Sequence, residues 1–149
     1  MPPYEYDRLC QQIVEDAQEA IIFADRDGII RLWNSGAQAI FGYTAEEALG
    51  QTLDLIIPQQ YRDRHWEGYN RVMSTGKTRL DKELLAVPAI RKDGGRVSLE
   101  FSIVLMRDTN NELIGIAAII HEVTERRQRE KEMKERLATL EAKMKNIST

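Results

Sequence analysis

The sequence predicts an α+β fold built around one antiparallel sheet. Three observations favour this class: the first third holds two β-rich runs joined by an Asp-Gly turn, helix-like segments follow, and three further β-rich runs precede a charged tail. Strands grouped in this way around a set of helices are typical of α+β domains. With 149 residues, of which 42% are hydrophobic, the chain has room for one domain with its own core.

A helix and then a hairpin are predicted first. Residues 6–18 place apolar side chains at helical spacing. Residues 20–24 and 29–33 are β-rich runs that flank the sequence Asp-Arg-Asp-Gly. Because Gly28 adopts the positive φ that a tight turn requires, Asp-Gly between two apolar runs predicts a hairpin.

Three helical segments are predicted next. Residues 34–42 form a short helix-like segment. Thr44 and Glu47 have the spacing of a capping box, in which a hydroxyl and a carboxylate satisfy free N–H groups at a helix start. The longest helix is predicted over residues 59–75, where Gly76 ends it.

The last third predicts three strands. Residues 97–105 alternate as a half-buried antiparallel strand does, and residues 113–120 form the final strand. The run before residue 91 contains Pro88, which cannot donate to a strand ladder, so we expect that strand at a sheet edge. Residues 91–95 form the turn between the first two of these strands.

From Thr124 the chain is dense in charge and contains neither glycine nor proline. Its apolar residues recur at steps of four, three, four and three: Met133, Leu137, Leu140, Met144 and Ile147. This heptad pattern predicts a parallel dimeric coiled coil. Arg126 and Glu130 fall on seam positions near the domain and weaken the coil there, and a single solvated terminal helix is the alternative.

Composition argues against several classes. The net charge of −3 disfavours a dedicated nucleic-acid binder, although the mixed-charge tail leaves that as a weak third hypothesis. No apolar run reaches the length of about 18 residues needed to span a membrane, and no signal-peptide pattern begins the chain. One cysteine, Cys10, suits a reducing cytoplasm, and it leaves too few soft ligands for structural zinc. No nucleophile lies beside a base, so we do not expect an enzyme.

His65 is the residue whose role the pattern leaves open. On the helix predicted over residues 59–75, it falls within the apolar stripe beside Tyr69 and Val72, whereas Glu67 faces away. Its imidazole is therefore expected to point into the domain. A histidine in such a position is either a ligand for a bound group or a core residue bonded to a backbone carbonyl.

Residues 16–127 resemble a PAS domain. The resemblance rests on the order and spacing of "IIFADRDGIIRLWNSGAQAIFGYTAEEALGQ", "RKDGGRVSLEFSIVLMRD" and "GIAAIIHEVTERR". It implies a five-stranded sheet of order 2-1-5-4-3 and a sensory, dimerising module. The chain then divides into an N-terminal helical cap (1–18), a PAS domain (19–123) and a C-terminal coiled-coil signalling helix (124–149).

The resemblance also assigns roles at the end of the last strand. The family pattern ends with Asp, a β-branched residue and Thr, and this chain has Glu122, Val123 and Thr124. Glu122 and Thr124 are therefore expected to pass the signal to a homodimeric coil. The expected partner is an output domain outside this chain, such as the kinase of a two-component system or a cyclase.

A heme site is implied by a closer local resemblance. In heme-binding oxygen-sensor PAS domains, the proximal histidine lies at the position of His65. Here Trp66 replaces the aspartate that follows that histidine, and Tyr69 comes four residues after it rather than three. Leu85 replaces the arginine that binds oxygen in those sensors. With Phe101 and Ile103 it would form an apolar distal wall, which suits carbon monoxide, nitric oxide or a redox role better than oxygen.

Two alternatives to heme stay open. A non-covalent flavin could stack on Trp33 or Trp66, although core packing explains both side chains; flavin photochemistry is excluded, because the Asn-Cys-Arg string it needs is missing. The second alternative is a cofactor-free PAS domain that serves dimerisation, with its pocket filled by its own side chains.

Overall fold

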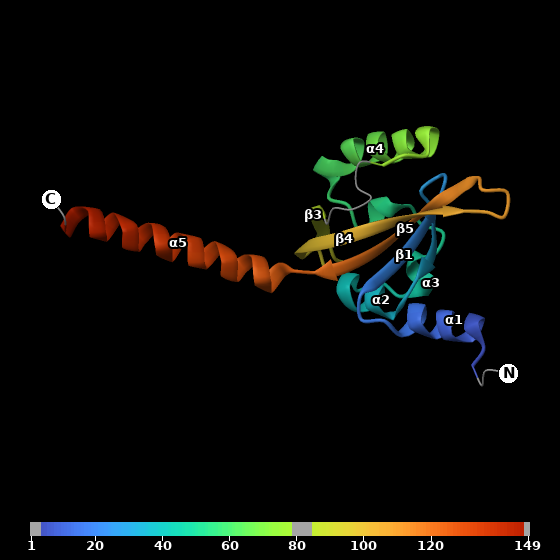
Figure 1. Cartoon of the computed structure of the whole chain (residues 1–149), viewed down its shortest axis with the longest axis horizontal. Coiled ribbons are helices and arrows are strands. Elements are labelled where there is room, and N and C mark those ends of the chain that lie inside the picture. The colour runs from blue at the N-terminus through green and yellow to red at the C-terminus, as the bar shows by residue number, and fades with distance from the viewer. Residues whose placement is uncertain (1–3, 79–84, 148–149) are drawn as a thin grey trace.

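The computed structural model describes residues 4–78 and 85–147. In the strand that begins at residue 85, side chains are described from residue 87 onward. A five-stranded antiparallel sheet forms the body of the domain, and a long C-terminal helix leaves it (Figure 1). The strands are β1 (Ala20–Asp25), β2 (Ile30–Trp33), β3 (Leu85–Ile90), β4 (Arg96–Arg107) and β5 (Leu113–Glu122). The helices are α1 (Tyr6–Asp16), α2 (Ser35–Phe41), α3 (Ala45–Ala48), α4 (Arg62–Thr75) and α5 (Thr124–Ile147), with 3-10 turns at Leu53–Leu55 and Gln59–Tyr61.

The strand order is β2-β1-β5-β4-β3, which confirms the order that the family resemblance implied. β5 is the central strand and pairs with β1 on one side and β4 on the other. β3, which carries Pro88, pairs with β4 and lies at the edge, as the proline predicted. The last strand of the sequence is therefore the middle of the sheet, and α5 leaves directly from it.

Most element boundaries differ from the prediction by one or two residues, and three of the differences have a clear physical cause or a capping turn. The helix predicted from residue 59 begins with a 3-10 turn, and its α-helical part starts at Arg62. β4 and β5 extend beyond the apolar runs to Arg107 and Glu122, because cross-strand pairing continues through polar residues at their ends. Gly76 ends α4 in the left-handed conformation, as predicted.

The core lies on one face of the sheet, which we call the inner face. Alternate residues of β1, namely Ala20, Ile22 and Ala24, are buried on this face. The first two belong to one apolar cluster and the third belongs to another. The larger cluster packs α2 and α3 against the sheet and contains Phe41 at its centre. The smaller cluster packs α4 against the hairpin end of the sheet.

Local sequence explains the N-terminal elements. Gly28 has φ of +77° at the hairpin turn, and Thr44 and Glu47 form the predicted capping box of α3. Asn34 caps α2 and is buried, with 4% of its surface exposed. Its amide nitrogen donates to the carbonyl oxygens of Val14 and Glu19, at 2.8 and 3.0 Å, and so ties the end of α1 to the domain.

The C-terminal helix differs from every other element. α5 extends away from the sheet as a single rod, and none of its residues is buried (Figure 1). Within the described residues, no helix has both the length and the apolar character needed to cross a bilayer.

Candidate functional site

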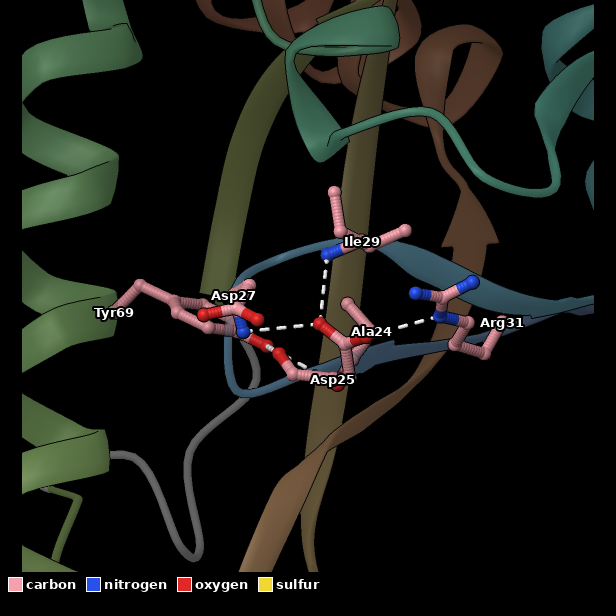
Figure 2. A network of polar contacts seen from close by, with 6 residues as sticks. All are labelled: Ala24, Asp25, Asp27, Ile29, Arg31 and Tyr69. Carbon is pink, nitrogen blue, oxygen red and sulfur yellow. Dashed lines mark hydrogen bonds and ion pairs between the residues drawn. The ribbon is translucent and has the colours of Figure 1, made fainter.

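Tyr69 fastens α4 to the β1–β2 hairpin. Its ring enters the hairpin from the α4 side, and its hydroxyl donates to the carbonyl oxygens of Ala24 and Asp25 at 3.1 and 2.5 Å (Figure 2). Burial raises the pKa of Tyr69 far above its usual value, with a smaller contribution from nearby carboxylates. The hydroxyl therefore stays protonated and remains a donor at every physiological pH.

The hairpin that receives Tyr69 is organised by the Asp25 carboxylate. One oxygen accepts from the backbone N–H of Asp27 and of Ile29, at 2.9 and 3.1 Å, and the other accepts from Arg31 Nε at 2.9 Å (Figure 2). Burial acts to raise the pKa of Asp25, but these donors outweigh it and hold the pKa below its usual range. The turn is therefore held by contacts within the hairpin itself, in addition to those with α4.

Two further side chains complete this attachment. The Trp66 ring lies so close to Gly28 that a Cβ added there would meet the ring at 2.1 Å, and its indole N–H donates to Asp54 Oδ1 at 2.7 Å. Arg26 reaches from the hairpin to the carbonyl oxygens of Leu113 in β5, at 2.7 Å, and of Met73 in α4, at 3.4 Å. We call Arg26, Gly28, Trp66 and Tyr69 the α4 clamp.

His65 lies inside this region, and one nitrogen of its ring has no hydrogen-bond partner. Its ring packs edge-on against Trp66 and tilted against Tyr69, with centroid distances of 4.7 and 5.8 Å. Its Nδ1 atom is buried and is the one buried side-chain nitrogen or oxygen in the described chain that lacks a hydrogen bond. Burial lowers the pKa of His65, and the Asp54 carboxylate opposes this only in part. The imidazole is therefore held neutral, as metal ligation requires.

A porphyrin does not fit beside His65 in this conformation. Two open hollows in the described part of the chain, about 700 and 430 Å³ in volume, lie at the end of β5 and beside Phe41, and His65 lines neither. Aromatic rings occupy the space around the imidazole instead. No group of three or more His, Cys, Asp or Glu residues in the described chain could hold a metal ion.

The other residues predicted for the heme site fall into two groups, with Tyr69 separate from the residues of β3 and β4. Tyr69 belongs to the smaller apolar cluster, whereas Phe101 packs against the larger one. Ile103 is half-buried and lies two residues after Phe101 on the same, inner face of β4. The backbone of Leu85 pairs with Phe101 in the β3–β4 ladder, and the Leu85 side chain lies outside the described part of the chain.

The root of α5 is joined to β4 by a second set of contacts, which we call the exit junction (Ser98, Glu100, Val123, Thr124 and Arg126). The Val123 N–H donates to the Ser98 carbonyl at 2.8 Å, and the Ser98 N–H donates to the Thr124 hydroxyl at 3.0 Å. Arg126 forms an ion pair with Glu100. The first turn of α5 is therefore positioned by β4 as well as by β5.

Glu122 makes fewer contacts in the exit junction than Thr124 does. Its carboxylate accepts from the Thr124 hydroxyl at 3.2 Å, while Glu100 forms the ion pair with Arg126. His121 is exposed and lies 3.7 Å from Glu19. The larger cavity opens here, between the end of β5 and the first turns of α5, and is lined mainly by charged side chains.

Sequence reasoning missed several residues that position these two regions. Asn34 lies between a strand and a helix, and its capping role can be predicted from that position. Its hydrogen bonds to the segment before β1 cannot be predicted in this way. Ser98 and Glu100 lie on the exposed side of β4 in the alternation, where nothing in the sequence connects them with residues 26 positions later. For Trp66 the sequence indicates core packing or flavin stacking, but not the contact with Gly28.

A model of the PAS fold matches residues 14–128, which include the sheet, the α4 clamp and the exit junction. The chain belongs to the PAS family. A PAS domain from Colwellia psychrerythraea superposes with a TM-score of 0.71 over 81% of this chain and 99% of its own, at 20% identity. That likeness supports the shared fold.

Two curated relatives, a sensor protein and a signal transduction kinase, contain a region similar to this chain. The sensor protein FixL of Bradyrhizobium diazoefficiens is 26% identical over 129 residues, which cover 84% of this chain. The signal transduction histidine-protein kinase AtoS of Escherichia coli is 27% identical over 140 residues, which cover 91% of this chain. This PAS chain spans 24% and 22% of the lengths of these two relatives.

Proposed function

We propose that this PAS domain is the sensory module of a longer signalling protein and that α5 carries its signal outward as one strand of a parallel dimeric coiled coil. Its input is a small molecule, a gas or a redox change sensed at α4. Its output is a changed position of α5 relative to the sheet. The sensor protein and the signal transduction histidine kinase among the relatives, each several times longer than this chain, support an output domain such as a histidine kinase.

The observation that carries this proposal is the exposed seam of α5. Met133, Leu137, Leu140 and Met144 lie on one side of the helix and are between 56% and 70% exposed. A regular apolar seam on a solvated helix gains stability only when a second surface covers it. The domain does not supply that surface, because α5 leads away from it.

The contacts of the α4 clamp give a physical route from input to output. Arg26 bonds both to α4 and to the start of β5, and β5 runs directly into α5. A ligand that displaced α4 would act on Arg26 at one end of β5, while the exit junction holds the other end. Glu122 and Thr124 would then transmit the change to the coil. We assign no catalytic residue to this module, and we place its action in the cytoplasm.

Sedimentation equilibrium of the whole chain tests this proposal. We expect a concentration-dependent dimer that Leu140→Lys dissociates, because a buried unpaired ammonium is costly in a coil seam. Ala142→Lys is the matched control, since residue 142 lies on the opposite side of the helix from Leu140. A monomer at all concentrations, or equal effects of the two substitutions, would contradict the proposal.

Heme ligated by His65 is the sharper form of the proposal, and the unbonded Nδ1 of His65 favours it. Tyr69, Leu85, Phe101 and Ile103 would border the porphyrin. Since aromatic rings now surround the imidazole, binding would require α4 to move away from the sheet. Reconstitution with hemin should give a Soret band that His65→Ala alters and His121→Ala leaves unchanged.

A cofactor-free dimerisation module is the second candidate, and the closely packed rings around His65 favour it. In that case neither hemin nor a flavin should raise the melting temperature of the chain. Dimerisation should still depend on Leu137 and Leu140. A rise in melting temperature with either cofactor would exclude this candidate.

A further inference from the structure

The Asn34 side chain joins three elements of the N-terminal half. Within the described residues, Asn34 is the one buried residue with an amide or charged side chain. Its Oδ1 atom accepts from the backbone N–H of Ile21 in β1 and of Ala37 in α2, at 2.8 and 2.9 Å. Its Nδ2 atom donates to the carbonyl oxygens of Val14 in α1 and of Glu19, at 2.8 and 3.0 Å. One amide therefore satisfies backbone groups of α1, β1 and α2 together.

α1 depends on these bonds for its place on the domain. None of its residues is buried, and its apolar Tyr6, Leu9 and Ile13 are between 43% and 79% exposed. The carbonyl group of Val14 lies in the last turn of α1, where the helix supplies few donors and no basic side chain is present. The Asn34 amide is the donor that the structure provides for it. Because a segment that buries few apolar side chains opens at low free-energy cost, the bonds from Asn34 decide whether α1 stays docked.

Gly36 gives the segment after α1 room to pass over α2. A Cβ atom added at Gly36 would overlap the carbonyl oxygen of Glu19 and lie 2.5 Å from that of Gln18. The backbone of residues 18–19 therefore lies directly against the first turn of α2, where no side chain fits. Gly68, which is also helical, has nothing within 4 Å of an added Cβ. The close approach at Gly36 thus belongs to the attachment of α1.

The same segment lies beside the end of β5. The β1–β5 ladder runs to the pair Ala20 and Ile120. Glu19 therefore lies next to His121, and its carboxylate is 3.7 Å from the imidazole Nδ1. Val123, two residues further on, donates its N–H to β4 in the exit junction. The place of α1 is therefore fixed within a few residues of the start of α5, on a path that does not include α4.

We infer that Asn34 is a positioning residue that couples the docking of α1 to the exit junction, so that α1 is a second point of input to α5, separate from α4. With the amide bonds made, α1 and residues 18–19 hold the end of β5. When these bonds break, α1 opens as a unit and the Val123 N–H loses part of its protection from solvent. The inference rests on the proposed function only where it names α5 as the output, since the docking of α1 is measured without it.

Asn34→Asp separates the two ends of the amide. The carboxylate keeps an acceptor for the N–H groups of Ile21 and Ala37, and aspartate is as good an N-cap as asparagine. It removes the donor to Val14 and Glu19 and places a negative charge against their carbonyl oxygens. The substitution should therefore release α1 while β1 and α2 remain joined.

Amide hydrogen exchange of the full-length chain, followed residue by residue by NMR, measures this release. In Asn34→Asp, exchange should rise at least about tenfold for the α1 amides and at least about threefold for Val123, from the loss of two buried hydrogen bonds. The Gly76 amide, which donates to Val72 at the end of α4, should be unchanged. Asn70→Asp is the matched control, because it makes the same change at an exposed position of α4, and it should leave α1 and Val123 unchanged.

Gly36→Ala releases the same segment by a different means. It leaves the Asn34 side chain intact but puts a methyl group against residues 18–19, and alanine favours the α2 helix over glycine. It should raise the exchange of the α1 amides and of Val123, as Asn34→Asp does. Gly68→Ala is its control and should change neither. Gly36→Ala also decides the question if Asn34→Asp does not fold.

Three outcomes would contradict the inference, each in a different way. Faster exchange in α1 with Val123 unchanged would make Asn34 a structural residue alone and overturn the coupling. Unchanged exchange in α1 in both variants would overturn the role of Asn34 in docking. A uniform increase at all amides, those of α4 included, would mean that the whole domain is destabilised. The coiled coil is tested separately, because its failure appears as a monomeric wild-type chain in sedimentation.

Discussion

The helices α4 and α5 differ in how their apolar side chains are covered. α4 buries Tyr69 and Met73 against the sheet, and its attachment uses donors and acceptors of the domain itself. α5 buries no residue, and its regular apolar seam lies in solvent. The stability of α4 therefore belongs to the single chain, whereas under the proposed function that of α5 depends on a second surface. Substitutions at the two helices should change different measured quantities.

The largest expected effect on the free energy of unfolding comes from the α4 clamp. Gly28→Ala should destabilise the domain by about 3 kcal/mol, the sum of backbone strain at positive φ and overlap with the Trp66 ring. Gly50 is the matched control, since its φ is +87° and a Cβ there would meet nothing within 4 Å. Gly50→Ala should cost about 1 kcal/mol in urea unfolding, from strain alone.

Tyr69→Phe should have the next largest effect. It leaves the ring in place but removes a donor from two carbonyl oxygens, which should cost about 1 to 2 kcal/mol of unfolding free energy. The exposed Tyr61 provides the control, and Tyr61→Phe should stay within about 0.5 kcal/mol of the wild type. If the two variants unfold alike, the hydroxyl of Tyr69 does not anchor α4.

His65 should make stability depend on pH. Burial lowers its pKa in the folded chain, so the unfolded chain binds more protons as the pH falls below about 6.5. The contribution of His65 is therefore complete above that pH and decreases as the pH falls toward the folded pKa. Urea unfolding between pH 7.5 and about pH 5 should show this loss, and His65→Phe should reduce it. His121→Gln should retain it, and an equal slope in both variants would contradict the buried, neutral imidazole.

The smallest effect on the domain should come from the seam. Leu140→Lys should change the unfolding free energy of the sheet domain by less than about 0.5 kcal/mol when monomers are measured. The fluorescence of Trp33 and Trp66 reports this unfolding. The same substitution should reduce helix content and dimerisation together. A comparable loss in the domain would mean that α5 supports the sheet, against the contrast between the two helices.

Much of the fold could be predicted because it rests on short-range patterns. The turn at Gly28, the capping box at Thr44, the edge strand with Pro88 and the helix after residue 124 each depend on residues close together in sequence. The strand order came from the family resemblance, and the structure confirms it.

The candidate site could be predicted less completely, because its contacts join residues that lie far apart in sequence. Helical periodicity placed His65 on the inward face of α4, and its half-buried ring agrees with that. It could not reveal that Tyr69 bonds to carbonyls 44 and 45 residues away, or that Trp66 packs on Gly28. Those contacts fill the space beside His65, and no local pattern records them.

The central claim is that α5 works as half of a parallel, in-register coiled coil at the exit of the sheet. Oxidative cross-linking tests it most directly, with Leu140→Cys and Ala142→Cys each introduced into the full-length Cys10→Ser chain. In a parallel coil, residue 140 faces its own copy across the seam and residue 142 faces away. We expect rapid disulfide formation at residue 140 and little at residue 142. Equal cross-linking at both positions, or none at residue 140, would contradict the account.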